Sequence, residues 1–333
     1  MIISRTPFRI SFFGGGTDYP VWYEENGGIV LSTTINKYCY INCRYLPPFF
    51  PYNYRIRYSL HEEVQSVSEI KHPSVRECLK FVNLDNRGVE IQHNADVPAM
   101  SGLGSSSSFT VGLLNVLCAL KGKMITKRQL ALDAIHVEQN RIKENVGSQD
   151  QTAVAFGGFN KIEFGGEQEI TVQPVTICKE KLDLLQRSLM LFFTGFSRKA
   201  SDIAGEQIKR TPEKKKELET MIGLVEEAVN ILNNSKDTLA DFGRLLHEQW
   251  MIKRSLTSKI SSSFIDETYE AAVGDGALGG KLLGAGGGGF MLFFVRPEDQ
   301  PKVKERLRKL LYVPFSFENL GSQIIYYAPT DNF

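Results

Sequence analysis

The stretch Lys281–Phe290 reads K-L-L-G-A-G-G-G-G-F, with glycine at five of the six positions 284–289, and the apolar run 291–295 follows directly. Glycine loses more backbone entropy on folding than any other residue, so a dense cluster beside a strand needs a physical reason. Either another group approaches the main chain closely, or the chain repeatedly adopts positive φ. The alternative is a flexible tether, but tethers alternate with serine and do not run straight into a strand. We interpret the stretch as a loop that cradles a ligand.

A second glycine-rich segment lies almost two hundred residues earlier. Residues 98–108 read P-A-M-S-G-L-G-S-S-S-S and lead into the apolar segment 109–120, which predicts a buried helix ending at Gly122. The first amides of a helix are unpaired and carry partial positive charge, which favours phosphate binding. The Walker pattern G-x-x-x-x-G-K-[S/T] is absent. The alternative is an ordinary serine N-cap, which needs one serine rather than four.

Size and composition indicate an ordinary globular protein. The 333 residues suffice for two domains, and 42% hydrophobic and 23% charged residues are typical values. A net charge of +1 provides no global field that would attract nucleic acid or an anionic membrane, so any phosphate binding must be local. There is no signal-peptide pattern or membrane-spanning apolar run, and the five scattered cysteines suggest reduced thiols. We expect a cytoplasmic protein.

The pattern along the chain predicts an α+β fold of two domains, residues 1–185 and 186–333. Thr126 and Gln129 form a capping-box pattern that opens a helix running to about residue 145. A long helical region is expected over 212–255 and another helix over 298–311. Strands are expected at 10–13, 29–35, 38–43, 54–58, 89–93, 189–194 and 290–295, and near 313 and 324.

Glu138 interrupts an apolar helix stripe. Leu130, Ala134, Glu138 and Ile142 share i, i+4 spacing and therefore one face. A carboxylate there is costly unless it is paired or binds a metal ion, and the residues alone leave a buried salt bridge and a metal site equally open. A hydroxyl, a carboxylate and substrate phosphates together would be a typical Mg²⁺ environment.

Three further polar residues are candidates for substrate chemistry. Asp150 lies in G-S-Q-D-Q, in a turn-like segment just past a helix end, from which its side chain can project into a cleft. Arg9 precedes a strand that ends in G-G-G-T-D at Asp18. Asp18 could bind substrate hydroxyls, and Arg9 could hold a carboxylate or developing negative charge. Each also has an ordinary alternative, as an Asx turn, a turn residue or a surface ion pair.

Three motifs together resemble the GHMP small-molecule kinases, the family of galactokinase, homoserine kinase, mevalonate kinase and phosphomevalonate kinase. They are R-x-P-x-R-I-S-F-F-G-G-G-T-D, P-x-x-x-G-L-G-S-S-S and K-L-L-G-A-G-G-G-G-F, in family order across nearly the whole chain. The G-G-G-T-D form looks like the branch that phosphorylates the anomeric hydroxyl of heptoses and related sugars.

The resemblance implies an N-terminal domain like domain 2 of ribosomal protein S5 and a C-terminal ferredoxin-like domain, with the active site between them. It implies that Asp150 is the catalytic aspartate with Arg9 beside it, and that Ser106 and Glu138 bind Mg²⁺. The residues implied for the ATP phosphates are Pro98, Ser101, Gly102, Leu103, Gly104, Ser105, Ser106, Ser107 and Ser108. Those implied for the sugar are Gly16, Thr17, Asp18, Gly286 and Gly287. Met100 stands where many members have glycine, and Ser105 is an alternative metal ligand.

The resemblance further implies transfer of the ATP γ-phosphoryl group to the anomeric hydroxyl of a heptose 7-phosphate, in the synthesis of heptose-containing surface polysaccharides. A distal phosphate requires cations on the sugar side, for which Arg198 and Lys199 are candidates. The alternatives are a kinase of a neutral sugar (fucose, galactose or unphosphorylated heptose) and a non-catalytic sugar and ATP sensor. A nucleic-acid binder is disfavoured by the charge balance and by the lack of a basic, aromatic stripe.

Overall fold

The computed structural model describes residues 1–84, 87–166, 170–195, 200–234 and 238–329. The strands are β1 (Ile2–Phe13), β2 (Gly28–Tyr45), β3 (Tyr54–Arg57), β4 (His61–Val64), β5 (Val89–Ala95), β6 (Phe159–Phe164), β7 (Ile170–Pro174), β8 (Leu189–Phe193), β9 (Ala277–Leu282), β10 (Phe290–Val295), β11 (Leu311–Tyr312), β12 (Phe317–Glu318) and β13 (Gln323–Tyr327). The helices are α1 (Pro20–Asn26), α2 (Pro73–Phe81), α3 (Ser105–Leu120), α4 (Lys127–His136), α5 (Gln149–Phe156), α6 (Lys179–Arg187), α7 (Ala200–Arg210), α8 (Lys215–Asn233), α9 (Leu239–Ser255), α10 (Ser263–Gly274) and α11 (Gln300–Arg306). Short 3₁₀ turns occupy Val67–Glu69 and Thr211–Lys214, and a π-helical turn occupies Val137–Ile142.

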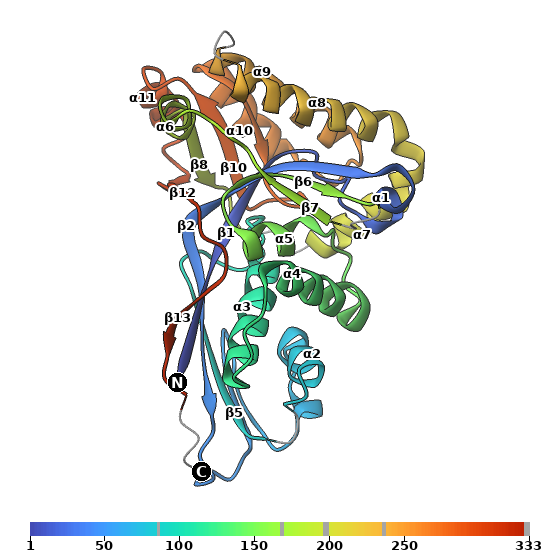
Figure 1. The fold of residues 1–333 in the computed structure, drawn as a ribbon. Helices are drawn as coiled ribbons and strands as arrows, with labels where there is room; N and C mark the ends of the chain where they lie inside the picture. The colour runs from blue at the N-terminus through green and yellow to red at the C-terminus, as the bar shows by residue number, and fades with distance from the viewer. Residues whose placement is uncertain (85–86, 167–169, 196–199, 235–237, 330–333) are drawn as a thin grey trace.

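The first sheet is built around β2, which merges two strands that the sequence suggested separately. In the described residues its strand order is β13-β1-β2-β5-β3-β4, with β6 and β12 also paired to β2, and β7 paired to β6. β1 and β2 are antiparallel, and Arg9 lies opposite Thr34. The inward aromatic residues Phe8, Phe12 and Phe13 are fully buried. Helices α2, α3, α4 and α5 lie on the same side of this sheet (Figure 1).

Helix α3 confirms the expected buried helix and begins four residues earlier than the apolar run. It starts at Ser105 and is buried on nearly all sides from Ser107 to Leu120. The chain leaves it at Gly122 with a φ of +67°. The serines therefore form its first turn, where the unpaired amides lie.

The second sheet has the strand order β11-β8-β10-β9. Its central strand β10 is the apolar run that follows the glycine-rich stretch, and all six of its residues are buried. Helices α8, α9, α10 and α11 surround this sheet in the upper part of Figure 1. Trp250 of α9 and Tyr269 of α10 pack in its core.

The end of the chain returns to the first sheet. β12 pairs with β2, and β13 pairs with β1. The domain boundary predicted between residues 185 and 186 falls within α6, just before the second sheet begins, and it stays a proposal. By hydrogen bonding, the strands within 317–327 belong to the first sheet.

The helices that carry Glu138 and Asp150 differ from the sequence expectation. Thr126 caps α4 by accepting from the amide of Gln129, as predicted. α4 nevertheless ends at His136 and continues as the π-helical turn, in which Glu138 is fully buried. Asp150 was expected in a turn-like segment, and this was wrong. It lies in the first turn of α5.

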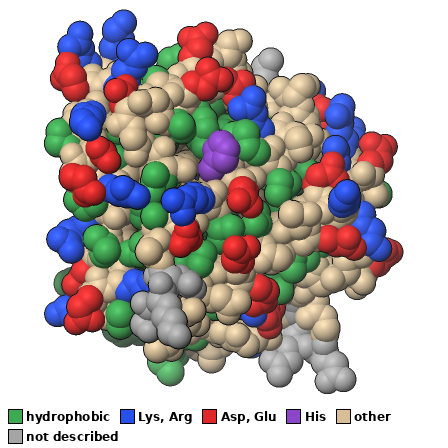
Figure 2. All heavy atoms as spheres, turned by 90° about the horizontal axis from the view of Figure 1, so that it is seen from above, with side chains coloured by type: hydrophobic (Ala, Val, Ile, Leu, Met, Phe, Trp, Pro, Cys, Tyr) green, Lys and Arg blue, Asp and Glu red, His purple; other side chains and the backbone are tan. Residues whose placement is uncertain are grey.

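Acidic and basic side chains alternate over the face that carries the helices of the second sheet (Figure 2). Among the described residues, no helix is both long enough and apolar enough to cross a bilayer.

Candidate active site

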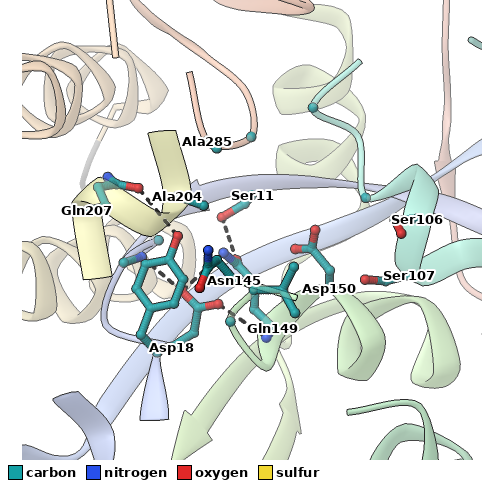
Figure 3. A pocket seen from close by; sticks show the side chains of 18 of the residues that line it. Ser11, Asp18, Ser106, Ser107, Asn145, Gln149, Asp150, Ala204, Gln207 and Ala285 are labelled. Carbon is teal, nitrogen blue, oxygen red and sulfur yellow. Dashed lines mark hydrogen bonds between the residues drawn. The ribbon is translucent and has the colours of Figure 1, made fainter. Parts of the chain in front are cut away.

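A cavity of about 590 Å³ lies where the two glycine-rich segments meet the helices of the second sheet. β1 and the turn after it, the serine loop with α3, the segment before α5, and helices α7 and α9 all contribute to its wall. The lining residues are Arg9, Ser11, Gly15, Gly16, Asp18, Tyr19, Met100, Gly102, Gly104, Ser105, Ser106, Ser107, Lys143, Glu144, Asn145, Val146, Gly147, Gln149, Asp150, Ala204, Gln207, Lys253, Lys281, Gly284 and Ala285. Figure 3 shows Asp150 between Asp18 and the serines Ser106 and Ser107. We call the region around Asp18 and Gln207 the Asp18 end and the region around the serines the serine end.

The two glycine-rich segments lie directly against each other. A Cβ on Gly102 would stand 2.4 Å from the carbonyl oxygen of Leu283, and one on Gly284 would stand 2.5 Å from the Cα of Gly102. The amide of Phe290 donates to the carbonyl of Ser101 at 3.1 Å. All five glycines within 284–289 have positive φ. The glycines are therefore needed for contact between the two loops and for repeated left-handed backbone, both of which exclude a side chain.

Two residues predicted to bind substrate lie elsewhere. Gly286 packs against the backbone of Ile260, and the amide of Gly287 donates to the Ile260 carbonyl at 3.0 Å. Neither lines the cavity, where Gly284 and Ala285 take that place. The assignment of Gly286 and Gly287 to the substrate therefore stays a prediction from the sequence, and the close approach seen here serves loop packing. Arg198 and Lys199 lie outside the described residues.

The serine loop divides into residues that face the cavity and residues that hold the loop. Gly104 precedes α3 in a left-handed conformation (φ +75°), which turns the first helical amides toward the cavity. Gly102, Gly104, Ser105, Ser106 and Ser107 line it. The other predicted residues hold the loop: Ser101 Oγ donates to the carbonyl of Pro98, Ser108 Oγ donates to the carbonyl of Pro7, and the Leu103 carbonyl accepts from the Arg9 amide.

Arg9 and Asp150 form a two-pronged ion pair at the centre of the cavity wall. Arg9 Nε donates to Asp150 Oδ1 and Nη2 donates to Oδ2, both at 2.7 Å. The remaining terminal nitrogen, Nη1, donates to the carbonyl of Gly102 at 2.6 Å. The Arg9 side chain is buried, whereas that of Asp150 is 24% exposed. The pair fixes a carboxylate that a substrate in the cavity can reach.

Asp18 is buried at the Asp18 end of the cavity. Its oxygens accept from the amide of Gly16 at 2.9 Å and from the amide and side chain of Gln149, both at 3.3 Å. Burial raises the pKa of Asp18, and the charge of Asp150 raises it further, while the main-chain hydrogen bonds oppose the change. Thr17 does not line the cavity, because its hydroxyl donates to the carbonyls of Gly14 and Ile29 and so holds the turn.

Glu138 lies behind the serine end and fits a cation. It is fully buried, and its Oε2 accepts from Ser107 Oγ at 3.0 Å and from the side chain of Gln151. No hydrogen bond from a described residue satisfies Oε1. Burial raises the pKa of Glu138 to about 7, and the nearby hydroxyl of Thr110 and the hydrogen bonds from Gln151 and Ser107 only partly offset it. An orphaned carboxylate oxygen behind serine hydroxyls is a suitable donor set for Mg²⁺.

The serine that contacts Glu138 is Ser107, whereas the sequence pointed to Ser106 or Ser105. Ser106 is exposed to the cavity beside it. Among the described residues, no three carboxylate, imidazole or thiol side chains gather at one point, so substrate phosphates or water would have to complete the coordination.

Sequence reasoning missed two buried lysines in the cavity wall, Lys253 on α9 and Lys281 on β9. They are 6% and 1% exposed. The signal for Lys253 was available, since Leu246, Trp250 and Lys253 share one helix stripe, as Glu138 shares another. Lys281 is the first residue of the glycine-rich stretch.

Comparisons with known proteins identify two family matches in this chain. Residues 73–158 match the family described as GHMP kinases N terminal domain, and residues 221–313 match the family described as GHMP kinases C terminal. D-glycero-alpha-D-manno-heptose 7-phosphate kinase from Campylobacter jejuni is 30% identical over 323 residues, which cover 92% of this chain and 93% of that protein. The chain belongs to the GHMP kinase family. The expected two-domain fold and the expected enzyme class, an ATP-dependent kinase, are thereby confirmed.

More distant relatives share the fold. A bifunctional fucokinase/GDP-fucose pyrophosphorylase from Arabidopsis thaliana is 24% identical over 331 residues, 91% of this chain and 30% of that protein. The crystal structure of a D-glycero-D-manno-heptose 1-phosphate kinase from Bacteriodes thetaiotaomicron has a TM-score of 0.72 at 24% identity, covering 98% of this chain and 99% of that chain. This structural likeness establishes the fold.

Proposed function

We propose that this GHMP kinase is a sugar kinase that transfers the γ-phosphoryl group of ATP to the anomeric hydroxyl of D-glycero-D-manno-heptose 7-phosphate. The observation that carries the proposal is the order of groups along one cavity. Asp18 and Gln207 lie at one end, the first turn of α3 lies at the other, and the Arg9–Asp150 pair lies between them (Figure 3).

The Asp18 end supplies hydrogen-bonding groups suited to hydroxyls, and we call it the sugar end from here on. Gln149 donates to Asp18 and accepts from the hydroxyl of Ser11 at 2.8 Å, so its amide is fixed in one orientation. Tyr19 donates to Gln207 at 3.4 Å across the same end. A sugar bound there would present one hydroxyl to Asp150, toward the serine end.

In the proposed reaction Asp150 accepts the proton of the attacking hydroxyl. Arg9 fixes the orientation of that carboxylate, since the guanidinium donates to both of its oxygens. The new bond forms between the sugar oxygen and the γ-phosphorus, while the bond from the phosphorus to the ADP oxygen breaks. Transition states of this kind are loose, so positioning and charge neutralisation supply most of the catalysis.

The phosphates of ATP would lie at the serine end. The α3 amides, turned into the cavity after Gly104, and the hydroxyls of Ser105 and Ser106 would contact their oxygens. Glu138, with Ser106 and Ser107, would hold Mg²⁺, which supplies neutralisation of phosphate charge when bound.

The choice of a heptose 7-phosphate rests on the named relative from Campylobacter jejuni. A distal phosphate needs a cation beyond the sugar end. Arg210 and Lys214 line a small hollow that shares Gly16, Tyr19 and Gln207 with the main cavity, so they are described candidates for this role. Arg198 stays a further candidate from the sequence.

The test is ATP consumption by the purified protein against a panel of sugars with and without a distal phosphate. We expect sugar-dependent ADP release that is fastest with the heptose 7-phosphate. Equal kcat/KM for the phosphorylated and unphosphorylated heptose would contradict the assigned substrate, and no release with any sugar would contradict the kinase proposal and favour a sensor.

Asp150→Asn tests the proposed base. The substitution keeps the shape of the side chain but removes its charge, so kcat should fall by roughly 10³-fold or more while ATP affinity, measured by calorimetry, stays within about threefold. Near wild-type turnover in this variant would show that Asp150 is not the base.

A further inference from the structure

Two buried cations are held on either side of the contact between the glycine-rich segments. Arg9 Nη1 donates to the Gly102 carbonyl, and Lys253 Nζ donates to the Gly284 carbonyl. Gly102 and Gly284 touch, since a Cβ on Gly284 would lie 3.3 Å from the carbonyl oxygen of Gly102. The guanidinium and the ammonium are therefore fixed on neighbouring carbonyls where both loops reach the cavity.

The ammonium of Lys253 is left without a matching carboxylate. The charges that act on it are those of Arg9, Asp18 and Asp150. Both oxygens of Asp150 are occupied by Arg9, and Asp18 accepts from the amides of Gly16 and Gln149. Within the described part of the chain, the one hydrogen bond that the Lys253 ammonium makes is to the Gly284 carbonyl, although an ammonium has three donors.

Lys281 adds a third basic side chain to the same wall. Its Nζ donates to the carbonyl of Phe12 at 2.8 Å, and the charges acting on it include Lys253 and Arg9. Burial lowers the pKa of Lys281 well below its ordinary value, and the charges of Lys253 and Arg9 lower it further. Three buried basic side chains thus share this wall with the carboxylates Asp18, Glu144 and Asp150, of which Asp150 is already paired with Arg9. Burial lowers the pKa of Lys253 to about 8, and the nearby charge of Arg9 lowers it further. An anion bound in the cavity would compensate the charge of this ammonium.

We propose that Lys253 is a catalytic residue that binds the γ-phosphoryl oxygens of ATP and stays on them through the transfer. This rests on the proposed kinase function and adds a cation from the second sheet to it. The position favours the transferred group over a distal sugar phosphate. Lys253 is held by Gly284, Gly284 packs against Gly102 of the serine loop, and the Gly102 carbonyl accepts from Arg9, the partner of Asp150. In the transfer the phosphorus–oxygen bond to ADP breaks, the sugar–phosphorus bond forms, and the proton goes to Asp150. Lys253 keeps its proton.

The test is Lys253→Met, with Lys302→Met as the matched control because the Lys302 side chain is 68% exposed. Both variants are assayed with whichever sugar gives turnover. We expect Lys253→Met to lower kcat by roughly 10²-fold or more, with the KM for the sugar unchanged within about threefold. Its thermal unfolding midpoint should equal or exceed that of the wild type, because a poorly compensated buried charge is removed.

Three results would overturn the assignment of Lys253 to the γ-phosphoryl group. Wild-type kcat in the variant would show that Lys253 does not act in transfer. A raised KM confined to phosphorylated sugars would place Lys253 on the sugar's own phosphate. A lowered unfolding midpoint with equal losses for ATP and ADP binding would show that it only supports the Gly284 carbonyl.

A binding measurement decides the matter without a sugar. Wild type and Lys253→Met are titrated with ADP and with the non-hydrolysable analogue AMPPNP, each with Mg²⁺. We expect equal ADP affinities, and a loss of roughly tenfold or more in AMPPNP affinity for the variant. An unchanged AMPPNP affinity would refute the contact. If wild type shows no sugar-dependent turnover, the kinase proposal fails while this titration still tests Lys253.

Discussion

Replacing Gly284 with alanine tests whether the glycine-rich stretch exists for contact between the loops. Gly284 has a φ of +76°, and an added Cβ would meet the Cα of Gly102 at 2.5 Å. The left-handed backbone alone costs a non-glycine residue about 1 kcal/mol. Forcing a methyl group against rigid main chain adds roughly 1–3 kcal/mol. The expected loss in the free energy of unfolding is therefore about 2–4 kcal/mol.

Gly122→Ala is the matched control. Gly122 has a similar φ of +67°, but an added Cβ there would meet no atom within 4 Å. This variant should lose only about 1 kcal/mol, the backbone part of the cost. The difference between the two variants, measured in denaturant melts with equal m-values, isolates the close approach.

The same substitution should also affect catalysis. The Gly284 carbonyl holds Lys253, and Gly102 holds Arg9, so a displaced loop should lower kcat in Gly284→Ala and leave Gly122→Ala unchanged. If Gly284→Ala matched Gly122→Ala in both stability and kcat, the steric explanation of the glycine-rich stretch would be refuted.

Two further predictions concern the ends of the cavity. At the sugar end, a Cβ on Gly147 would stand 1.8 Å from Oδ2 of Asp18, so Gly147→Ala should raise the KM for the sugar roughly tenfold or more, with the KM for ATP unchanged in steady-state kinetics. At the serine end, burial raises the pKa of Glu138 from 4.5 to about 7, so the folded state without metal favours the protonated carboxyl. The free energy of unfolding therefore falls by up to roughly 3 kcal/mol as the pH rises through this range. In EDTA, Glu138→Gln should therefore unfold at a higher temperature than wild type at pH 8 but not at pH 4.5. The variant should also bind Mg²⁺–ATP more weakly. A higher unfolding temperature for wild type at pH 8 would contradict the raised pKa of Glu138.

Local patterns predicted the elements that local physics controls. Thr126 caps a helix because its hydroxyl reaches an amide three residues away, and the apolar residues 109–120 form a buried helix because no face is polar. The turn around Asp150 was predicted wrongly, since the irregular segment after the π-helical turn ends at Ser148 and α5 begins at Gln149. Ser148 makes no side-chain capping hydrogen bond, and α5 is buried from Gln151 to Ala155, so tertiary packing rather than a local cap fixes where this helix starts.

The sequence by itself determined the family, the glycine-rich segments, and the residues Arg9, Asp18, Glu138 and Asp150 that now lie around one cavity or directly behind it. These follow from motif spacing and from the cost of placing charge or glycine in unusual positions. Only the tertiary structure decided that Ser107 meets Glu138, that Gly284 rather than Gly286 reaches the cavity, and that Lys253 joins Arg9 there. The physical reason is that these contacts join separate elements, more than two hundred residues apart for Arg9 and Lys253, and their geometry depends on how those elements pack in the folded chain.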